Sequence, residues 1–196
     1  LTAEYERSLR GSAERAFGGD PLGAWLGPEG PLAPPVNIRM SNAGFAGNQN
    51  EFQIDINPLN PNFAIGSSND GRTSGTGYYR TSDGGATWFA ADMPGIGTSC
   101  CAPGIAYAAD GTAYFINLDT SPSVIHVTKS TDNGVTWTKM TDIPAPDRPN
   151  IVVDNSPASP HFGRIYVTYS DLGGATDEIR LVFSDNGAAT WSAKVN

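Results

Sequence analysis

Positively charged residues are scarce in this chain of 196 residues. Lysine and arginine total 12 against 20 aspartates and glutamates, which gives a formal net charge of −8. A protein that binds the nucleic-acid backbone needs clustered Lys and Arg, and the sequence has no such cluster. We therefore expect no nucleic-acid partner.

Long apolar runs are missing as well. No stretch approaches the roughly 18–20 consecutive apolar residues of a membrane-spanning helix, so we expect no membrane insertion. No secretory signal is recognisable at the N-terminus. We predict the mature form of a secreted or extracellular protein from which the signal has been removed.

Cysteine and histidine are too few for a recognisable metal motif. The only cysteines are the adjacent Cys100 and Cys101, and His126 and His161 have no ligand spacing to each other or to the cysteines. The cysteine pair therefore forms a vicinal disulfide, stays free, or binds a soft metal with outside ligands. We predict no protein-held metal site. Calcium is left open as a cofactor because the loops are rich in Asn and Asp, although no loop has EF-hand spacing.

Glycine, proline and apolar residues are abundant instead, with 23 Gly, 15 Pro and 39% hydrophobic residues, which is typical of a compact β-rich protein. Three near-copies of one pattern recur: TSDGGATW at 81–88, STDNGVTW at 130–137 and SDNGAATW at 184–191. Their aspartates lie 49 (83 to 132) and 53 (132 to 185) residues apart. That spacing is the length of one four-stranded propeller blade with its loops.

The pattern predicts a turn that closes a hairpin. A short Asp side chain accepts hydrogen bonds from backbone N–H groups one or two residues on, and the following Gly supplies a positive φ. The Trp at the end is expected to bury its ring against a neighbouring sheet. We predict structural roles for the following residues of the three copies: Asp83, Gly85 and Trp88; Asp132, Gly134 and Trp137; Asp185, Gly187 and Trp191.

The pattern Ser/Thr-x-Asp-x-Gly-x-Thr-Trp resembles the Asp-box, or BNR repeat, of sialidase-like β-propellers. Two copies match it fully, whereas the third has one extra residue between Gly187 and Thr190 and Phe183 in place of the first Ser/Thr. In that family the box joins the third and fourth strands of a blade, on the face away from the ligand. Residues 48–196 are also similar to secreted bacterial BNR-repeat proteins of unassigned activity, most clearly at 57–62, 147–157 and 163–167.

The fold class predicted is all-β, a β-propeller with three four-stranded blades at about 48–95, 96–143 and 144–196. Segments rich in Val, Ile, Tyr and Phe occur in sets of four between turn signals. The expected strands are 52–56, 63–67, 77–81 and 87–91 in the first blade, 104–108, 112–118, 124–129 and 136–140 in the second, and 150–154, 164–169, 178–183 and 190–195 in the third.

Three blades leave open sheet sides, because a propeller is completed by typically four to eight blades in a ring. Either two copies of the chain pair into a six-bladed ring, or another polypeptide supplies blades, or this is a piece of a longer product. Residues 1–35 differ from the repeats. Apolar residues at intervals of four predict a short helix over 2–17, followed by a Pro/Gly-rich arm over 20–35 with Trp25 and Leu26 as anchors.

Ligand binding is expected on the rim opposite the boxes. Aligning the blades by their first strands places Glu51, the Cys101-Ala102 pair and Arg148 at equivalent positions, and the loops after the second strands add further polar residues. The ligand-binding candidates are Glu51, Asn69, Asp70, Arg72, Cys100, Cys101, Asp119, Asp147, Arg148 and Asp171, with Asp177 and Glu178 beside them.

Two functions from different classes remain. A catalytic sialidase of the resembled family has an Arg-Ile-Pro motif, an arginine triad, a Tyr–Glu nucleophile pair and an Asp acid/base, but the nearest match here is Ile38-Arg39-Met40. We therefore favour a non-catalytic extracellular propeller that binds glycans or assembles with further blades. The alternative is part of a sialidase-type glycoside hydrolase whose other active-site residues lie elsewhere.

Overall fold

The computed structural model describes residues 38–41, 48–70, 75–94, 101–121, 123–145, 147–172 and 176–195. The chain divides into two compact units, Leu1–Asn37 and Ile38–Asn196. The first unit lies outside the described residues, and with it the predicted helix and arm. The described residues contain strands and turns but no helix, and thus no helix long and apolar enough to cross a membrane.

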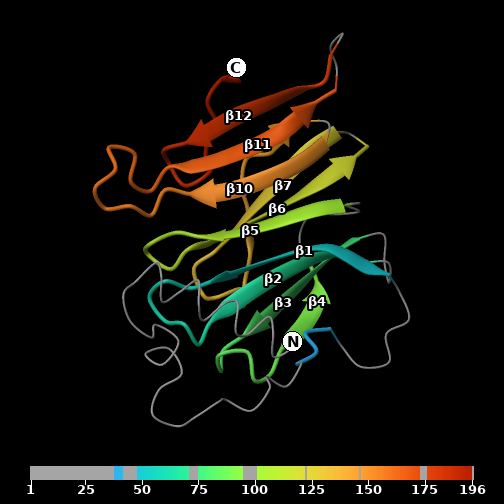
Figure 1. Cartoon of the computed structure of the whole chain (residues 1–196), viewed down its shortest axis with the longest axis vertical. Helices are drawn as coiled ribbons and strands as arrows, with labels where there is room; N and C mark the ends of the chain where they lie inside the picture. The colour runs from blue at the N-terminus through green and yellow to red at the C-terminus, as the bar shows by residue number, and fades with distance from the viewer. Residues whose placement is uncertain are drawn as a thin grey trace, which may run out of the picture. The chain divides into compact units, whose positions relative to one another are not determined.

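The described residues form three antiparallel sheets, which Figure 1 shows in succession from teal and green through yellow to orange and red. The first sheet contains β1 (Gln49–Ile56), β2 (Ala64–Asp70), β3 (Gly75–Thr81) and β4 (Phe89–Asp92). The second contains β5 (Cys101–Tyr107), β6 (Ala113–Thr120), β7 (Ser123–Ser130), β8 (Thr138–Lys139) and β9 (Ile143–Pro144). The third contains β10 (Asp147–Val153), β11 (Ile165–Asp171) and β12 (Glu178–Ser184).

The first three strands predicted for each blade are present in order. The fourth strand predicted at 87–91 is present as β4, whereas the fourth strands of the second and third blades differ from the prediction. In the second sheet the outer edge is split into β8 and β9, both paired with β7. The segment predicted as a strand at 190–195 forms only an isolated bridge between Val195 and Leu181. Its regular ladder is interrupted where the side-chain hydroxyl of Ser192 accepts a hydrogen bond from the Phe183 N–H at 3.1 Å.

Two apolar clusters hold the sheets together. Ile65 and Tyr78 of the first sheet pack with Ile105, Tyr107 and Phe115 of the second. A larger cluster joins the second and third sheets, and its fully or nearly fully buried members include Tyr114, Ile116, Ile151, Ile165 and Val167. The first strands of the three sheets, which we call the inner strands, lie together, because β1 and β10 both pack against β5. Each sheet therefore buries one face against the next sheet in the chain.

The repeated pattern forms the turn after the third strand in the first two sheets. The backbone N–H of Thr87 donates to the Asp83 carboxylate at 2.9 Å, four residues on rather than the one or two that we predicted. Thr136 and Asp132 repeat this bond at 2.9 Å. The predicted positive φ is present two residues after each Asp, at 90° in Gly85 and 79° in Gly134.

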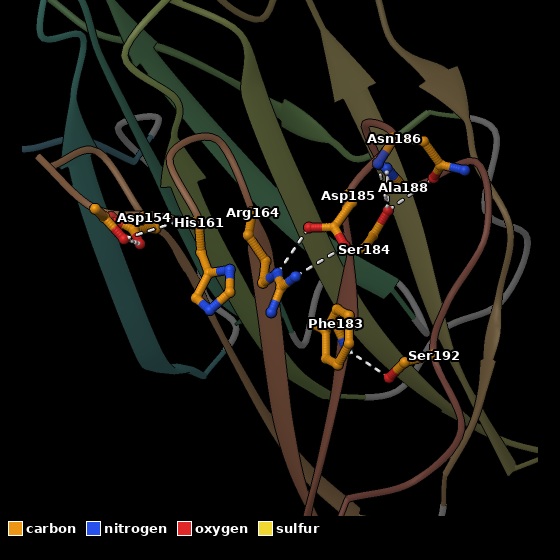
Figure 2. Close-up of polar contacts among 10 residues, drawn as sticks. Asp154, His161, Arg164, Phe183, Ser184, Asp185, Asn186, Ala188 and Ser192 are labelled. Atoms are coloured by element: carbon orange, nitrogen blue, oxygen red, sulfur yellow. Dashed lines mark hydrogen bonds and ion pairs between the residues drawn. The ribbon is translucent and has the colours of Figure 1, made fainter. Parts of the chain in front are cut away.

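The third turn is shifted by one residue from the predicted alignment (Figure 2). Asn186, rather than Asp185, accepts the Thr190 N–H at 3.0 Å and receives the Ser184 hydroxyl at 2.9 Å. Ala188, rather than Gly187, occupies the position of Gly85 and Gly134, with φ 67°. No residue is inserted and Phe183 is not part of the turn. Asp185 instead forms a bidentate ion pair with Arg164 at 2.6 and 3.0 Å.

The tryptophans of the second and third turns reach the preceding sheet. Trp137 lies edge-on to Tyr78 of the first sheet, with ring centroids 5.9 Å apart. The indole N–H of Trp191 donates to the Thr141 carbonyl of the second sheet at 2.9 Å. The indole N–H of Trp88 donates to Gly85 in its own turn at 3.0 Å. The turns therefore contribute to the joints between sheets as well as to the hairpins.

The shifted third turn predicts unequal effects of two neighbouring substitutions. Asn186→Ala should lower the free energy of unfolding by about 1–2 kcal/mol, because the backbone N–H of Thr190 loses its acceptor. Asp185→Ala should lower it by a smaller amount, because it removes only an ion pair of a surface carboxylate. Urea unfolding of both variants would measure the difference, and a larger loss for Asp185→Ala would contradict this alignment.

The first turn predicts a dependence of stability on acid. The Thr87 hydroxyl and backbone N–H, with the Thr81 hydroxyl, lower the pKa of Asp83 from 3.8 to about 2. Because the folded pKa lies below the unfolded value, the ionised carboxylate stabilises the fold above about pH 4, and this stabilisation is lost as pH falls toward 2. Thr87→Val should raise the Asp83 pKa measured by NMR titration; an unchanged titration curve would refute the role of Thr87.

Candidate functional site

The three innermost strands share an unusual backbone feature near their starts. Each has an irregular register with its neighbour, between Asn50 and Gln53 in β1, Cys101 and Gly104 in β5, and Asp147 and Asn150 in β10. One residue in each bulge is left-handed: φ is 51° at Glu51, 49° at Ala102 and 49° at Arg148. Non-glycine residues seldom take this conformation, and β-bulges often re-aim side chains next to sites. These are the positions that the sequence alignment treated as equivalent.

β5 packs between β1 and β10, so the three bulges lie close together. They border one pocket of about 290 Å³. The three sheets each contribute to its wall. The lining residues are Glu51, Phe52 and Gln53 from β1, Ala102 and Pro103 from β5, and Arg148, Pro149 and Asn150 from β10. The sequence analysis missed the other five lining residues, which adjoin the predicted ones along the three strands: Phe52, Gln53, Pro103, Pro149 and Asn150.

Side chains of β1 fix the position of β5 beside this pocket. The Glu51 carboxylate accepts a hydrogen bond from the Ala102 N–H at 3.2 Å, and the side-chain amide oxygen of Gln53 accepts one from the Ile105 N–H at 3.3 Å. Asp55 accepts the Tyr107 N–H at 2.7 Å. Backbone donors on an unpaired strand edge must find acceptors when they leave water. These three bonds provide them, and they join the first two sheets at the pocket.

The pocket carries opposite charges on opposite sides. The Glu51 carboxylate also accepts a hydrogen bond from the side-chain amide of Asn69, on β2 of the same sheet, at 3.0 Å. The Arg148 side chain is 82% exposed, and its Nε lies 3.5 Å from the carboxylate of neighbouring Asp147. Phe52 is 81% exposed. The wall thus offers a carboxylate, a guanidinium, two side-chain amides and an aromatic face.

The predicted aspartates Asp70, Asp119 and Asp171 occupy one equivalent position, at or near the end of the second strand of each sheet. They do not line the pocket. Asp70 receives the Gln49 amide at 3.3 Å, whereas Asp171 pairs with Lys194 at 2.9 Å. Glu178 is an ion-pair partner of Arg180. These carboxylates belong to local networks at the same end of the sheets as the pocket.

His126 forms a cluster that the sequence analysis did not predict. Its Nδ1 lies 3.1 Å from Asp142, and its Nε2 lies 3.6 Å from Asp119. Lys139 also pairs with Asp142 at 3.1 Å. The register of β6 and β7, which places His126 opposite Asn117, is the signal that could have found the contact with Asp119. Within the described ranges no three His, Cys, Asp or Glu side chains are grouped as metal ligands.

The remaining predicted residues do not line the pocket or lie outside the described residues. Cys101 is disulfide-bonded, and the only other cysteine of the sequence is Cys100, which lies outside the described residues, as Arg72 does. Arg39 donates to Ser41 at 3.1 Å and does not line the pocket. The turns of the repeated pattern lie at the opposite end of the sheets from the pocket, because they follow the third strands, which run antiparallel to the second.

No protein-family model matches the sequence, and no curated protein matches it significantly. Solved structures do match in fold. An exo-β-1,3-galactanase from Phanerochaete chrysosporium has a TM-score of 0.57 and 16% identity over 79% of this chain and 38% of its own. The α-L-arabinofuranosidase of Fusarium graminearum has a TM-score of 0.54 and 16% identity over 83% and 50%. A family 117 glycoside hydrolase of Zobellia galactanivorans has a TM-score of 0.54 and 12% identity over 80% and 58%.

The chain is therefore distantly similar in fold to β-propeller glycoside hydrolases, which agrees with the fold that the repeated pattern predicted. It spans between 38% and 58% of the length of the three matched chains. The described residues form three antiparallel sheets, which match part of those propellers.

The left-handed bulge in β5 predicts a stabilising substitution. Ala102→Gly should raise the free energy of unfolding by about 0.5–1 kcal/mol, because glycine adopts a φ of 49° without the steric cost of a Cβ. Ala106→Gly is the matched control in the same strand, where the regular buried position should make glycine destabilising. Equal destabilisation by the two substitutions in chemical unfolding would show that the bulge is not strained.

Proposed function

We propose that this chain is a non-catalytic, extracellular module of a sialidase-like β-propeller and that it binds carbohydrate in the pocket between the three inner-strand bulges. The observation that carries the proposal is the convergence of Glu51, Arg148 and the exposed Phe52 ring on one pocket. Sugars combine hydroxyl groups, which need hydrogen-bond partners, with an apolar ring face that packs on aromatic side chains. The pocket volume is at the lower limit of the roughly 300–1,000 Å³ of small-molecule sites.

A binding role without catalysis is favoured by the carboxylates. Glycoside hydrolysis commonly needs two carboxyl groups that flank the bond to be broken. Among the described residues that line the pocket, Glu51 is the only carboxylic acid. The described wall supplies one carboxylate and one guanidinium besides its two side-chain amides, which is sufficient to orient a sugar and insufficient for paired acid and nucleophile chemistry.

Export fits the covalent chemistry of the chain. Cys101 is disulfide-bonded, and disulfides persist mainly in oxidising compartments. The repeated turns, which we assign to the Asp-box family, support the same location through the secreted proteins that share them. We include no metal or cofactor in the binding site, and calcium bound by the loop oxygens is a separate prediction.

The second candidate is part of a sialidase-type glycoside hydrolase. It is favoured by the structural likeness to glycoside hydrolases, of whose length this chain spans 38% to 58%. In that case Arg148 and Glu51 would form one wall of an active site, and the remaining catalytic groups would lie on sheets outside this chain. The two hypotheses differ in whether the complete assembly hydrolyses a glycoside: only the second predicts that it does.

Carbohydrate binding can be tested with a glycan array, followed by calorimetric titration of a glycan that binds. Arg148→Ala and Glu51→Gln should each weaken binding about tenfold or more, because each removes a charge-assisted hydrogen bond. Arg164→Ala, at the opposite end of the sheets, is the control and should bind normally. If no glycan binds, or if the control loses binding equally, the pocket is not the site.

A fluorogenic sialoside separates the two candidates. The assay is run on the complete assembly, because the second candidate places its other catalytic groups on sheets outside this chain. We expect no cleavage there, and that result would reject the hydrolase hypothesis. Cleavage that Arg148→Ala abolishes would replace the binding module with the hydrolase hypothesis, and a parallel Arg39→Ala variant would show whether the arginine before the first sheet takes part.

A further inference from the structure

The second sheet is covered on both faces, whereas the third is covered on one. In β6 every residue from Ala113 to Leu118 is buried. In β11 the burial alternates: Ile165, Val167 and Tyr169 are buried, while Tyr166 and Thr168 between them are partly exposed. Alternation of this kind is expected of a sheet with one packed face. The third sheet therefore has a face without a partner among the described residues.

The first sheet has an exposed apolar stripe, formed by Ile54 and Ile56, on the face that points away from the second sheet. The strand registers place Ile54, Ile105 and Ile151 at one equivalent position, opposite the third residue of the following strand. Ile105 and Ile151 are each 5% exposed, because the preceding sheet covers them, whereas Ile54 is 53% exposed.

The next residue on the same face of each inner strand shows the same difference in exposure. Ile56 is 54% exposed, and its equivalents Tyr107 and Val153 are 1% and 6% exposed. The stripe therefore corresponds to a face that a preceding sheet buries in both other cases.

The uncovered face of the third sheet is equivalent to the face of the second sheet that packs on the third. Val152 is 57% exposed, and its equivalent Ala106, which is 5% exposed, lies in the cluster shared with the third sheet. Tyr166 is equivalent to Tyr114. A Cβ built at Gly187 of the next turn would lie 3.3 Å from the Tyr114 hydroxyl, so that tyrosine already packs on a following sheet.

Residues 38–41 leave the stripe on the first sheet open. Met40 lies over Gly66, where a Cβ would be 2.6 Å from the methionine methyl group. Phe115 and Val167 occupy the equivalent position in the other sheets and are fully buried. Met40 thus fills the volume of one missing side chain on this face, and Ile54 and Ile56 on β1 stay exposed beside it.

We propose that these two faces bind each other in two copies of this chain. The third sheet of one copy takes the place of a sheet before the first sheet of its partner, and the same contact recurs in the other direction. Val152 then packs by Ile54 and Ile56, and Tyr166 lies against Gly84, the glycine equivalent to Gly187. The pair has two-fold symmetry, so the contact occurs twice and closes a ring of six sheets in which both faces are covered. This dimer is independent of carbohydrate binding.

Light scattering across a range of concentrations tests the dimer, since one chain has a mass of 20.6 kDa. We expect twice that mass for the unmodified chain. Ile54→Asp and Val152→Lys should each raise the dissociation constant about 100-fold or more, because an unpaired charge would be buried at both contacts. Val135→Lys is the matched control, because Val135 is also 57% exposed and lies in a turn outside both faces.

Mixing the two variants gives the sharper result. Each variant keeps one unmodified face, so an equimolar mixture of Ile54→Asp and Val152→Lys should recover the dimer that neither forms alone, with one contact unmodified and opposite charges at the other. Circular dichroism and thermal unfolding would confirm that both variants are folded.

Three outcomes would overturn the proposal. The first is a single-chain mass at every concentration, which would leave these faces to sheets that this sequence does not include. The second is an unaffected dimer of Val152→Lys, which would indicate a contact between two first sheets. The third is an open-ended series of larger particles, which would show that two copies do not close.

Discussion

Burial of one sheet face by the next sheet is the interaction on which the rest of this structure depends. A hairpin or a single small sheet has little stability in water, because half of its side chains lack a partner. Here the two apolar clusters lie between successive sheets, and nearly all fully buried large side chains belong to them. The hydrophobic effect acts between repeats, and the hydrogen-bonded ladders within a sheet set the register of the side chains that it buries.

The polar contacts at the inner edge show why the packing also organises a site. The three acceptors on β1 satisfy backbone donors of β5, so the inner strands approach closely without losing hydrogen bonds. The bulges turn Glu51, Ala102 and Arg148 out of the ladder at the same level. A pocket between sheets follows from this arrangement, because no neighbouring strand fills the space beside a bulge.

Much of the fold could be predicted from the sequence, because turn chemistry and apolar segments are local properties. The first two turns had the expected glycines, and three strands of every sheet were found in order. The third turn was misaligned because pattern matching favoured Asp185 and Gly187. The geometry needs a short acceptor followed by a residue that tolerates positive φ, and Asn186 and Ala188 meet those needs with a less typical pair of residues.

The pocket could be predicted only in part, since equivalence of positions is visible in the sequence but backbone conformation is not. Glu51 and Arg148 were aligned, yet nothing in their identity indicates a left-handed φ. Gln53 and Asn150 come to the wall because the bulges shift the register by one residue. A repeat register taken as regular would place their side chains elsewhere.

The difference between the two ends of the sheets separates stability from function. At the turn end the three repeats use nearly the same chemistry, because each closes the same hairpin, and the second and third turns also pack on the sheet before them. At the pocket end one backbone conformation carries a carboxylate, a methyl group and a guanidinium at Glu51, Ala102 and Arg148. Identical side chains there would present a ligand with a repeated, nearly symmetric surface. Unlike side chains on an identical backbone would hold an asymmetric ligand of the proposed site in one orientation.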